Sequence, residues 1–165
     1  MRGMSNKTLR WIQGLFAPTQ APDTRADVTG ESAVAALLVR AARANDDYNP
    51  LQVAAIDAVL SRRFGLGPWD CAALRAKAEK LEAATGDSVH LTRAIKDVLP
   101  LEERPAYLRD LWEVILADGQ RHEQEDGLMR LVSNLLGLRD RDSAHARQYV
   151  QARMTEADDQ RPLAR

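Results

Sequence analysis

The sequence predicts an all-α fold, and three observations support this prediction. From about Thr29 onward, apolar residues recur at intervals of three and four positions, the spacing of one face of a helix. No stretch shows the alternation of β-branched and polar residues that indicates strands. The periodicity is interrupted at Asn, Asp, Pro and Gly residues of the kinds that begin and end helices.

The first two helices are defined by their caps. Thr29 is the expected N-cap of a helix that runs to about Asn45. Asn49 caps the next helix, because a proline follows it at the first helical position and Gln52 is placed to bond back to the cap. This second helix is expected to end near Gly65.

Two further helices complete the first half of the predicted domain. Pro68 begins a third helix at its first turn. Asp87 or Ser88 caps a short fourth helix, which stops before Pro100. The buried side of the third helix is expected to contain Trp69, Leu74, Ala78 and Leu81. The fourth helix carries Val89, Ile95 and Val98.

The helices of the second half are predicted from the same signals, namely caps, prolines and apolar periodicity. The next helix spans about residues 101–117, with Pro105 tolerated in its first turn, and its apolar face is the strongest in the chain. We therefore expect it to be the central helix. After an acidic loop comes a helix with a leucine-rich core face that includes Leu128 and Leu131 and ends at Gly137. A last helix begins near Asp140 or Asp142.

Composition limits the class of protein. A chain of 165 residues with 45% hydrophobic and 28% charged residues is typical of one globular domain. The net charge of −1 argues against a nucleic-acid partner. The single Cys71 rules out an intrachain disulfide and fits a reducing, cytoplasmic location. No apolar run approaches the roughly 20 residues of a membrane span.

Three parts are expected along the chain. Residues 1–28 form an N-terminal segment and linker, residues 29–156 the helical domain, and residues 157–165 a disordered tail. Within residues 1–16, basic side chains flank apolar ones at helical spacing, which predicts a short amphipathic helix. A helix docked on the domain or a frayed terminus is the favoured interpretation, and peripheral contact with the inner membrane surface is the alternative. Residues 17–23 are the linker.

Two segments repeat one another. Ala44-Asn45-Asp46 with Gln52 recurs as Ala117-Asp118-Gly119 with Glu125, at an offset of 73 residues, and the helix stops that follow recur at an offset of 72. Each segment is a helix end, a polar loop and a helix start. The repeat therefore predicts a duplicated helix-loop-helix unit.

The second of these loops is the strongest candidate site. Residues 118–126 contain four carboxylates and one imidazole, a density that suits a divalent cation such as calcium, magnesium or zinc. The candidate ligands are Asp118, His122, Glu125 and Asp126. The spacing does not match the calcium loop of an EF-hand, and the two-histidine zinc motif is missing.

A purely structural interpretation of this loop stays open. Glu125 can act as the capping-box acid of its helix, and Gly119 as a left-handed helix end. In the first loop, Asn45 and Gln52 stand where the second has Asp118 and Glu125, so both formal charges are lost there. Asp46 is a partial replacement, and at most a degenerate site is expected in the first loop.

The second half resembles a known family. The elements that carry the resemblance are Leu111-Trp112-Glu113-Val114, Ala117-Asp118-Gly119, Glu125-Asp126 and Leu128-Met129-Arg130, followed by Leu135-Leu136. Over roughly residues 31–150 the chain is similar to the tellurite-resistance TerB-like family. The resemblance implies a compact bundle of about seven helices with internal pseudo-twofold symmetry. It also implies a metal site in the paired acidic loops.

Two functions remain open on this basis. One is a cytoplasmic, stress-associated module that binds an ion through residues 118–126. The other is a metal-free scaffold that binds a protein partner and is held at the membrane by its N-terminal segment. An enzyme is not expected, because Cys71, His90 and His145 stand apart from any recognisable catalytic arrangement. The sequence does not indicate an oligomeric state.

Overall fold

The computed structural model describes residues 28–162, and these residues form seven α-helices and one short 3₁₀ helix, with no strand. The helices are α2 (Gly30–Arg43), α3 (Pro50–Phe64), α4 (Pro68–Ala84), α5 (Ser88–Val98), α6 (Arg104–Ile115), α7 (Glu123–Leu135) and α8 (Asp140–Asp159), with η1 (Leu101–Glu103) before α6. The all-α prediction and the expected number of helices are confirmed. Residues 1–27, which make up the N-terminal segment and linker except for Val28, lie outside the described residues.

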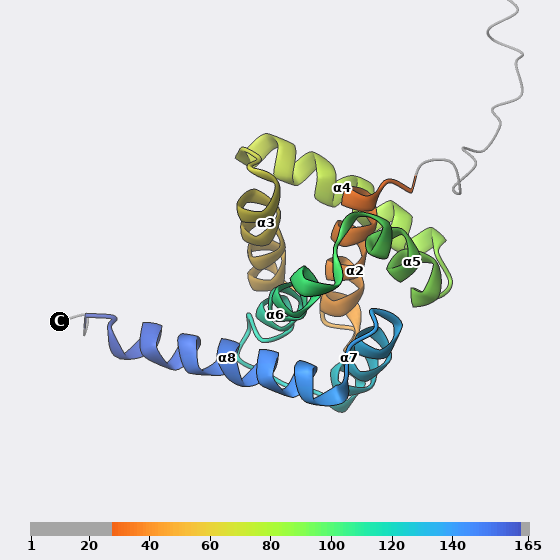
Figure 1. Cartoon of the computed structure of the whole chain (residues 1–165). Helices are drawn as coiled ribbons and strands as arrows, with labels where there is room; N and C mark the ends of the chain where they lie inside the picture. Colours follow the sequence, from red (N-terminus) through yellow and green to blue (C-terminus); the bar gives the residue numbers. More distant parts are fainter. Residues whose placement is uncertain (1–27, 163–165) are drawn as a thin grey trace, which may run out of the picture.

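Helix α2 is the centre of the bundle, and it contacts α3, α4, α5, α6 and α7 (Figure 1). The expectation that the helix at 101–117 would be central is corrected by this arrangement. The reason lies in the size of the α2 side chains. Ala33, Ala35, Ala36, Ala41 and Ala42 are all fully buried, and such small residues let several helices approach one backbone closely.

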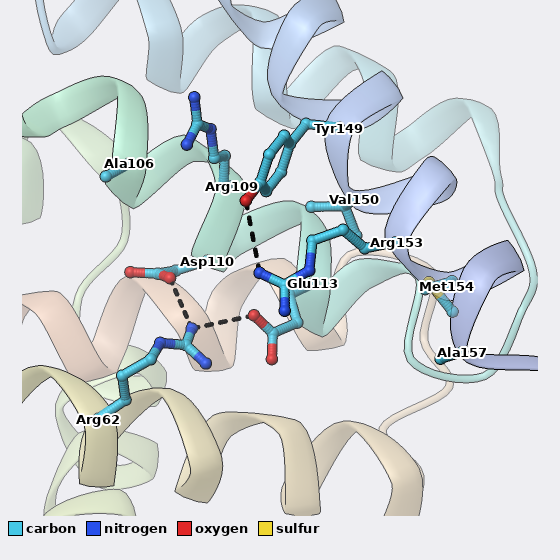
Figure 2. Close-up of a pocket in the computed structure, with 10 residues that line it drawn as sticks. All are labelled: Arg62, Ala106, Arg109, Asp110, Glu113, Tyr149, Val150, Arg153, Met154 and Ala157. Atoms are coloured by element: carbon cyan, nitrogen blue, oxygen red, sulfur yellow. Dashed lines mark hydrogen bonds and ion pairs between the residues drawn. The ribbon is translucent and has the colours of Figure 1, made fainter. Parts of the chain in front are cut away.

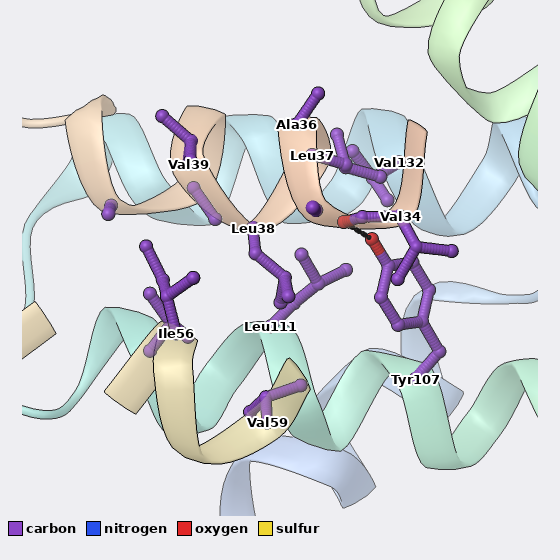
Figure 3. Close-up of a cluster of buried hydrophobic side chains, with 14 of the residues drawn as sticks. Val34, Ala36, Leu37, Leu38, Val39, Ile56, Val59, Tyr107, Leu111 and Val132 are labelled. Carbon is purple, nitrogen blue, oxygen red and sulfur yellow. Dashed lines mark hydrogen bonds between the residues drawn. The ribbon is translucent and has the colours of Figure 1, made fainter. Parts of the chain in front are cut away.

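Helix α6 packs against α2 on one side and against α8 on the other. Between α2, α3 and α6, aliphatic side chains fill the core, including Leu38, Ile56 and Leu111 (Figure 3). Tyr107 of α6 is fully buried in the same cluster, and its hydroxyl donates a hydrogen bond of 2.8 Å to the carbonyl oxygen of Val34. Burial and the nearby charge of Asp110 raise the pKa of Tyr107, so this hydroxyl stays a donor.

The start positions of the helices follow the sequence repeat. Helices α6, α7 and α8 begin at residues 104, 123 and 140, whereas α2, α3 and α4 begin at residues 30, 50 and 68, which is an offset of 72 to 74 residues. The pairing also recurs, because α4 packs on α2 and α8 packs on α6. The origin of the two halves in one duplicated unit stays a prediction.

Helix α8 continues to Asp159, into the range that the sequence assigns to a disordered tail. The reason is that no proline or glycine interrupts the chain before Pro162. The second half of α8 extends beyond the other helices (Figure 1). From Gln151 to Asp159 its side chains are exposed, apart from the half-buried Met154.

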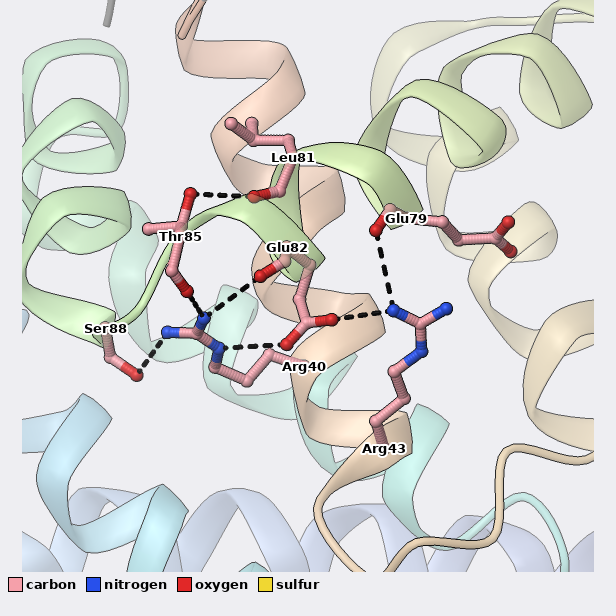
Figure 4. Close-up of polar contacts among 7 residues, drawn as sticks. All are labelled: Arg40, Arg43, Glu79, Leu81, Glu82, Thr85 and Ser88. Carbon is pink, nitrogen blue, oxygen red and sulfur yellow. Dashed lines mark hydrogen bonds and ion pairs between the residues drawn. The ribbon is translucent and has the colours of Figure 1, made fainter. Parts of the chain in front are cut away.

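An arginine of α2 ties the end of α4 to the centre of the bundle (Figure 4). The Arg40 Nε donates to Glu82 Oε1 at 3.3 Å, and the same guanidinium donates to the carbonyl oxygen of Thr85 and to Ser88 Oγ. Glu82 also accepts a hydrogen bond of 2.7 Å from Arg43 Nη1. The side chains of Arg40 and Glu82 are only 14% and 15% exposed, so this ion pair is shielded from water.

We expect Arg40→Met to lower the free energy of unfolding by about 1.5–2 kcal/mol, because it leaves a shielded carbonyl oxygen and hydroxyl without their charged donor. The effect stays moderate because Glu82 keeps its bond to Arg43. Urea unfolding followed by circular dichroism measures it. Arg93→Met, at an exposed position of α5, is the matched control and should change little. Equal losses in the two variants would contradict this role of Arg40.

Candidate functional site

The loop between α6 and α7 is held by local hydrogen bonds. The N–H of Gly119 donates to the carbonyl oxygen of Leu116 at 2.9 Å, and the φ angle of Gly119 is 75°, in the left-handed region that glycine adopts without strain. The N–H of Gln120 donates to Asp118 Oδ1 at 3.0 Å. These bonds place Asp118 at the turn that follows α6.

Glu125 is the buried acid of this loop. Its Oε2 accepts a hydrogen bond of 2.9 Å from the N–H of His122, which is the capping-box bond that the sequence predicts for the start of α7. Its Oε1 is buried and has no hydrogen-bond partner among the described residues. Burial raises the pKa of Glu125, and the charges of Asp118 and Asp126 act in the same direction, whereas the bond and charge of His122 lower it.

Asp118 connects this loop to the loop between α2 and α3. Its Oδ2 accepts a hydrogen bond of 3.0 Å from Nδ2 of Asn49, the residue that caps α3. The Oδ1 of Asn49 meanwhile accepts the N–H of Gln52 at 3.1 Å. The two polar loops of the sequence repeat therefore lie side by side and bond to one another directly.

The other predicted ligands are placed differently. Asp126 pairs with Arg121 at 2.7 Å on the surface, and His122 is half-buried at the N-cap of α7. In the described range, 28–162, no three His, Cys, Asp or Glu side chains are grouped so that they could hold a metal ion. Asp118 and Glu125 are the pair that shares the corner, and the predicted four-residue ligand set is not gathered into one cluster.

The first loop repeats the bonds of the second, residue for residue at the offset of 73. Asp46 has a φ of 61° where Gly119 has 75°, and its N–H donates to Arg43 as that of Gly119 donates to Leu116. The Oδ1 of Asn45 accepts the N–H of Asp47 at 3.1 Å, as Asp118 accepts that of Gln120. The two loops therefore share one backbone geometry, although their charges differ.

Gln52 occupies in the first loop the position that Glu125 occupies in the second. Gln52 is fully buried. In one orientation of its amide, the oxygen accepts the N–H of Asn49 at 3.3 Å, as Glu125 accepts that of His122. In the opposite orientation, which suits its surroundings better, the nitrogen takes the place of that oxygen and donates to the carbonyl oxygens of Asp47 and Ala42, at 2.6 and 3.2 Å. In this second orientation, a donor stands between two carbonyl oxygens of the first loop.

The sequence identifies the acidic pair but not Asn49 or the backbone carbonyls. It indicates Asn49 only as a helix cap, because no local pattern shows that its amide reaches a residue 69 positions away. Every residue carries a backbone carbonyl oxygen, so residue types do not reveal which carbonyls line the site. The sequence does show that Gln52 of the first loop is replaced by Glu125 in the second, and this difference points to the position.

Comparisons with known proteins agree with the fold. The family model described as tellurite resistance protein TerB matches residues 31–148. No curated protein matches the chain. No solved structure matches it either.

Proposed function

The chain belongs to the tellurite resistance protein TerB family, and from this premise we propose that its α6–α7 corner binds a divalent cation such as Ca²⁺. The observation that carries the proposal is the buried Oε1 of Glu125, which has no partner in the described residues. A buried carboxylate oxygen without a hydrogen bond costs free energy, and a cation would remove that cost.

The first loop supports this proposal by comparison. There the Gln52 amide nitrogen donates to two carbonyl oxygens. The positions equivalent to Ala42 and Asp47 in the second loop are Ile115 and Gln120, and from the repeat we infer that their carbonyl oxygens lie near Glu125, which has no amide nitrogen to donate. A carboxylate cannot donate to carbonyl oxygens, so this corner needs either a proton on Glu125 or a cation.

Calcium fits these groups better than magnesium or zinc. Ca²⁺ accepts carboxylate and backbone carbonyl oxygens in flexible geometry, whereas Mg²⁺ demands a strict octahedron. Zinc prefers nitrogen and sulfur ligands, and His122 is the one histidine or cysteine in the loop 118–126. Glu125 and Asp118 would hold the ion, and Asn49 would orient Asp118. The corner would then act as a binding site, not as a catalytic centre.

Isothermal titration of Ca²⁺, Mg²⁺ and Zn²⁺ into the full chain tests this proposal. We expect heat of binding with wild type and its loss in Glu125→Gln, which supplies the donor found in the first loop. Asp97→Asn, at an exposed acid of α5, is the matched control and should bind as wild type does. Equal heats from wild type and Glu125→Gln, or no heat from any ion, would rule out the site.

The family description also motivates a proposal about the cellular role. We propose that the module takes part in a stress response to tellurite through this cation site, in the cytoplasm. Tellurite-sensitive cells that gain resistance from the wild-type chain should not gain it from Glu125→Gln. Equal resistance from the two chains would mean that the stress role does not depend on the cation site at the α6–α7 corner.

A second candidate function is a metal-free scaffold for a protein partner. The observation that favours it is Trp69 at the start of α4, which is 88% exposed, since exposed tryptophans are frequent anchors of protein interfaces. None of the helices within residues 28–162 is long and apolar enough to cross a bilayer. We infer that contact with a membrane would run through residues 1–16, the amphipathic segment of the sequence.

Vesicle sedimentation tests the membrane contact. Vesicles containing anionic lipid should pull down the full chain, and the double variant Trp11→Ala/Phe16→Ala should lose most of this binding, because it removes the large apolar side chains of the segment. Trp69→Ala is the matched control for loss of an exposed tryptophan. If the double variant sediments as wild type does, the N-terminal segment is not the anchor.

A further inference from the structure

A cleft opens between α6, the outer half of α8 and the end of α3 (Figure 2). Its volume is about 420 Å³, within the range of small-molecule sites. It lies apart from the α6–α7 corner, and none of the candidate cation ligands lines it. Val150 and Met154 of α8 give it an apolar side, because both pack against the core.

The acidic groups of this cleft are already neutralised. Asp110 accepts hydrogen bonds from Arg62 Nη2 at 2.9 Å and from Arg63 Nε at 2.9 Å. Glu113 accepts a further bond of 2.9 Å from Arg62 Nη2. These bonds hold the end of α3 against α6 and leave two carboxylates matched by two guanidinium groups.

Two other arginines of the cleft have no acidic partner. Arg109 of α6 and Arg153 of α8 form no ion pair with any described residue, although both line the cleft. Instead they converge on the ring of Tyr149, with their Cζ atoms 4.2 and 5.8 Å from its centroid. Arg153 Nη1 also donates to the Tyr149 hydroxyl at 3.4 Å. The cleft therefore carries an uncompensated double positive charge beside an aromatic ring.

We propose that this cleft binds a small organic anion, in which a carboxylate or phosphate group is attached to an apolar body. Arg109 and Arg153 would hold the anionic group, since guanidinium groups bind both kinds of oxyanion through paired hydrogen bonds. Tyr149, Val150 and Met154 would cover the apolar body. The contacts with the Tyr149 ring restrain the two guanidinium groups before binding, which reduces the side-chain entropy lost on binding.

The fluorescent probe 8-anilinonaphthalene-1-sulfonate, an aromatic anion, tests the proposal on the full chain. We expect saturable binding that octanoate or octyl phosphate displaces, and the better of these two competitors identifies the preferred oxyanion. Octanol and inorganic phosphate should displace the probe poorly, because octanol lacks the anionic group and inorganic phosphate lacks the apolar body. Displacement by octanol as effective as that by octanoate would overturn the role of the arginines.

Variants locate the binding. Arg109→Gln/Arg153→Gln should weaken probe binding about tenfold, the loss expected for charge-assisted hydrogen bonds. Ala157→Glu adds a carboxylate at the cleft one turn after Arg153 and should weaken it as well, while leaving both arginines and the core in place. Arg141→Gln, on the exposed surface of α8 outside the cleft, is the control. Unchanged affinity in both cleft variants would place the probe elsewhere and refute the proposal.

Discussion

Trp112→Ala is expected to lower the free energy of unfolding by about 3–5 kcal/mol, the usual cost of removing a large aromatic side chain from a core. Trp112 is 2% exposed and lies in α6 where α8 packs on it. Its Nε1 donates a hydrogen bond of 3.0 Å to Ser143 Oγ of α8, and the guanidinium of Arg147 lies over its ring, 5.7 Å from the centroid. The substitution therefore removes a core side chain and the main polar link between α6 and α8.

Urea unfolding at pH 7, followed by far-ultraviolet circular dichroism, measures this loss. Trp69→Ala provides a control with the same chemical change, because Trp69 is 88% exposed and should cost no more than about 0.5 kcal/mol. Trp112→Phe should fall between the two, since it keeps most of the volume but leaves Ser143 without its donor. Similar losses for the two alanine variants would show that burial is not what makes Trp112 important.

Glu125→Gln is expected to raise the free energy of unfolding by about 1–3 kcal/mol at pH 7 in the absence of divalent cations, because it replaces a buried, unpartnered carboxylate oxygen by an amide that can donate a hydrogen bond as Gln52 does in the first loop. The pH dependence follows from the direction of the pKa shift. Burial raises the pKa of Glu125 above its ordinary value of 4.5, so the folded chain holds this proton more tightly than the unfolded chain. Wild-type stability therefore falls as the pH rises above about 4.5, until the folded carboxyl has ionised.

The variant has no proton to lose at this position, so its advantage over wild type should grow from pH 4 to pH 7. Urea unfolding in EDTA across this range measures the difference. Glu123→Gln, an exposed acid in the first turn of the same helix, is the control and should show no such growth. A Glu125→Gln variant that is less stable than wild type at pH 7 would mean that the carboxylate, not a donor, is what this corner requires.

Helix ends could be predicted well because they depend on local chemistry. Thr29, Asn49 and Asp87 are the N-caps of α2, α3 and α5, and each accepts a backbone N–H through its side chain. Such bonds join residues three positions apart, so the sequence contains the whole interaction. The choice between Asp87 and Ser88 is settled in favour of Asp87. The start of the last helix is settled at Asp140.

Helix faces were predicted less reliably, and Trp69 is the clearest error. It was expected on the buried side of α4, but that side begins at Cys71 and continues through Ala78 and Leu81. Trp69 precedes Cys71 by two residues, a rotation of about 200° around the helix, and so points to solvent. Val89, Val98 and Leu131 were likewise expected in apolar faces and are 44%, 54% and 48% exposed. Which neighbour covers a face depends on tertiary packing.

In the candidate cation site, too, local features could be predicted from the sequence and tertiary contacts could not. Residue types and spacing identified Asp118 and Glu125, because acids at a helix start are visible in the sequence. The ion pair that engages Asp126 could also have been considered, since Arg121 is only five residues away. The contact of Asn49 with Asp118 could not, because it depends on how α3 and α6 pack in the bundle.

Both ends of the Asn49 amide are occupied at once: its oxygen caps α3 and its nitrogen holds Asp118. Fraying of the first turn of α3 therefore releases the α6–α7 loop, and opening of that loop exposes the cap. Local opening of the two regions should be one cooperative event, with similar protection of their amides against hydrogen exchange. One side chain thus joins the two halves of the domain into a single unit of local unfolding.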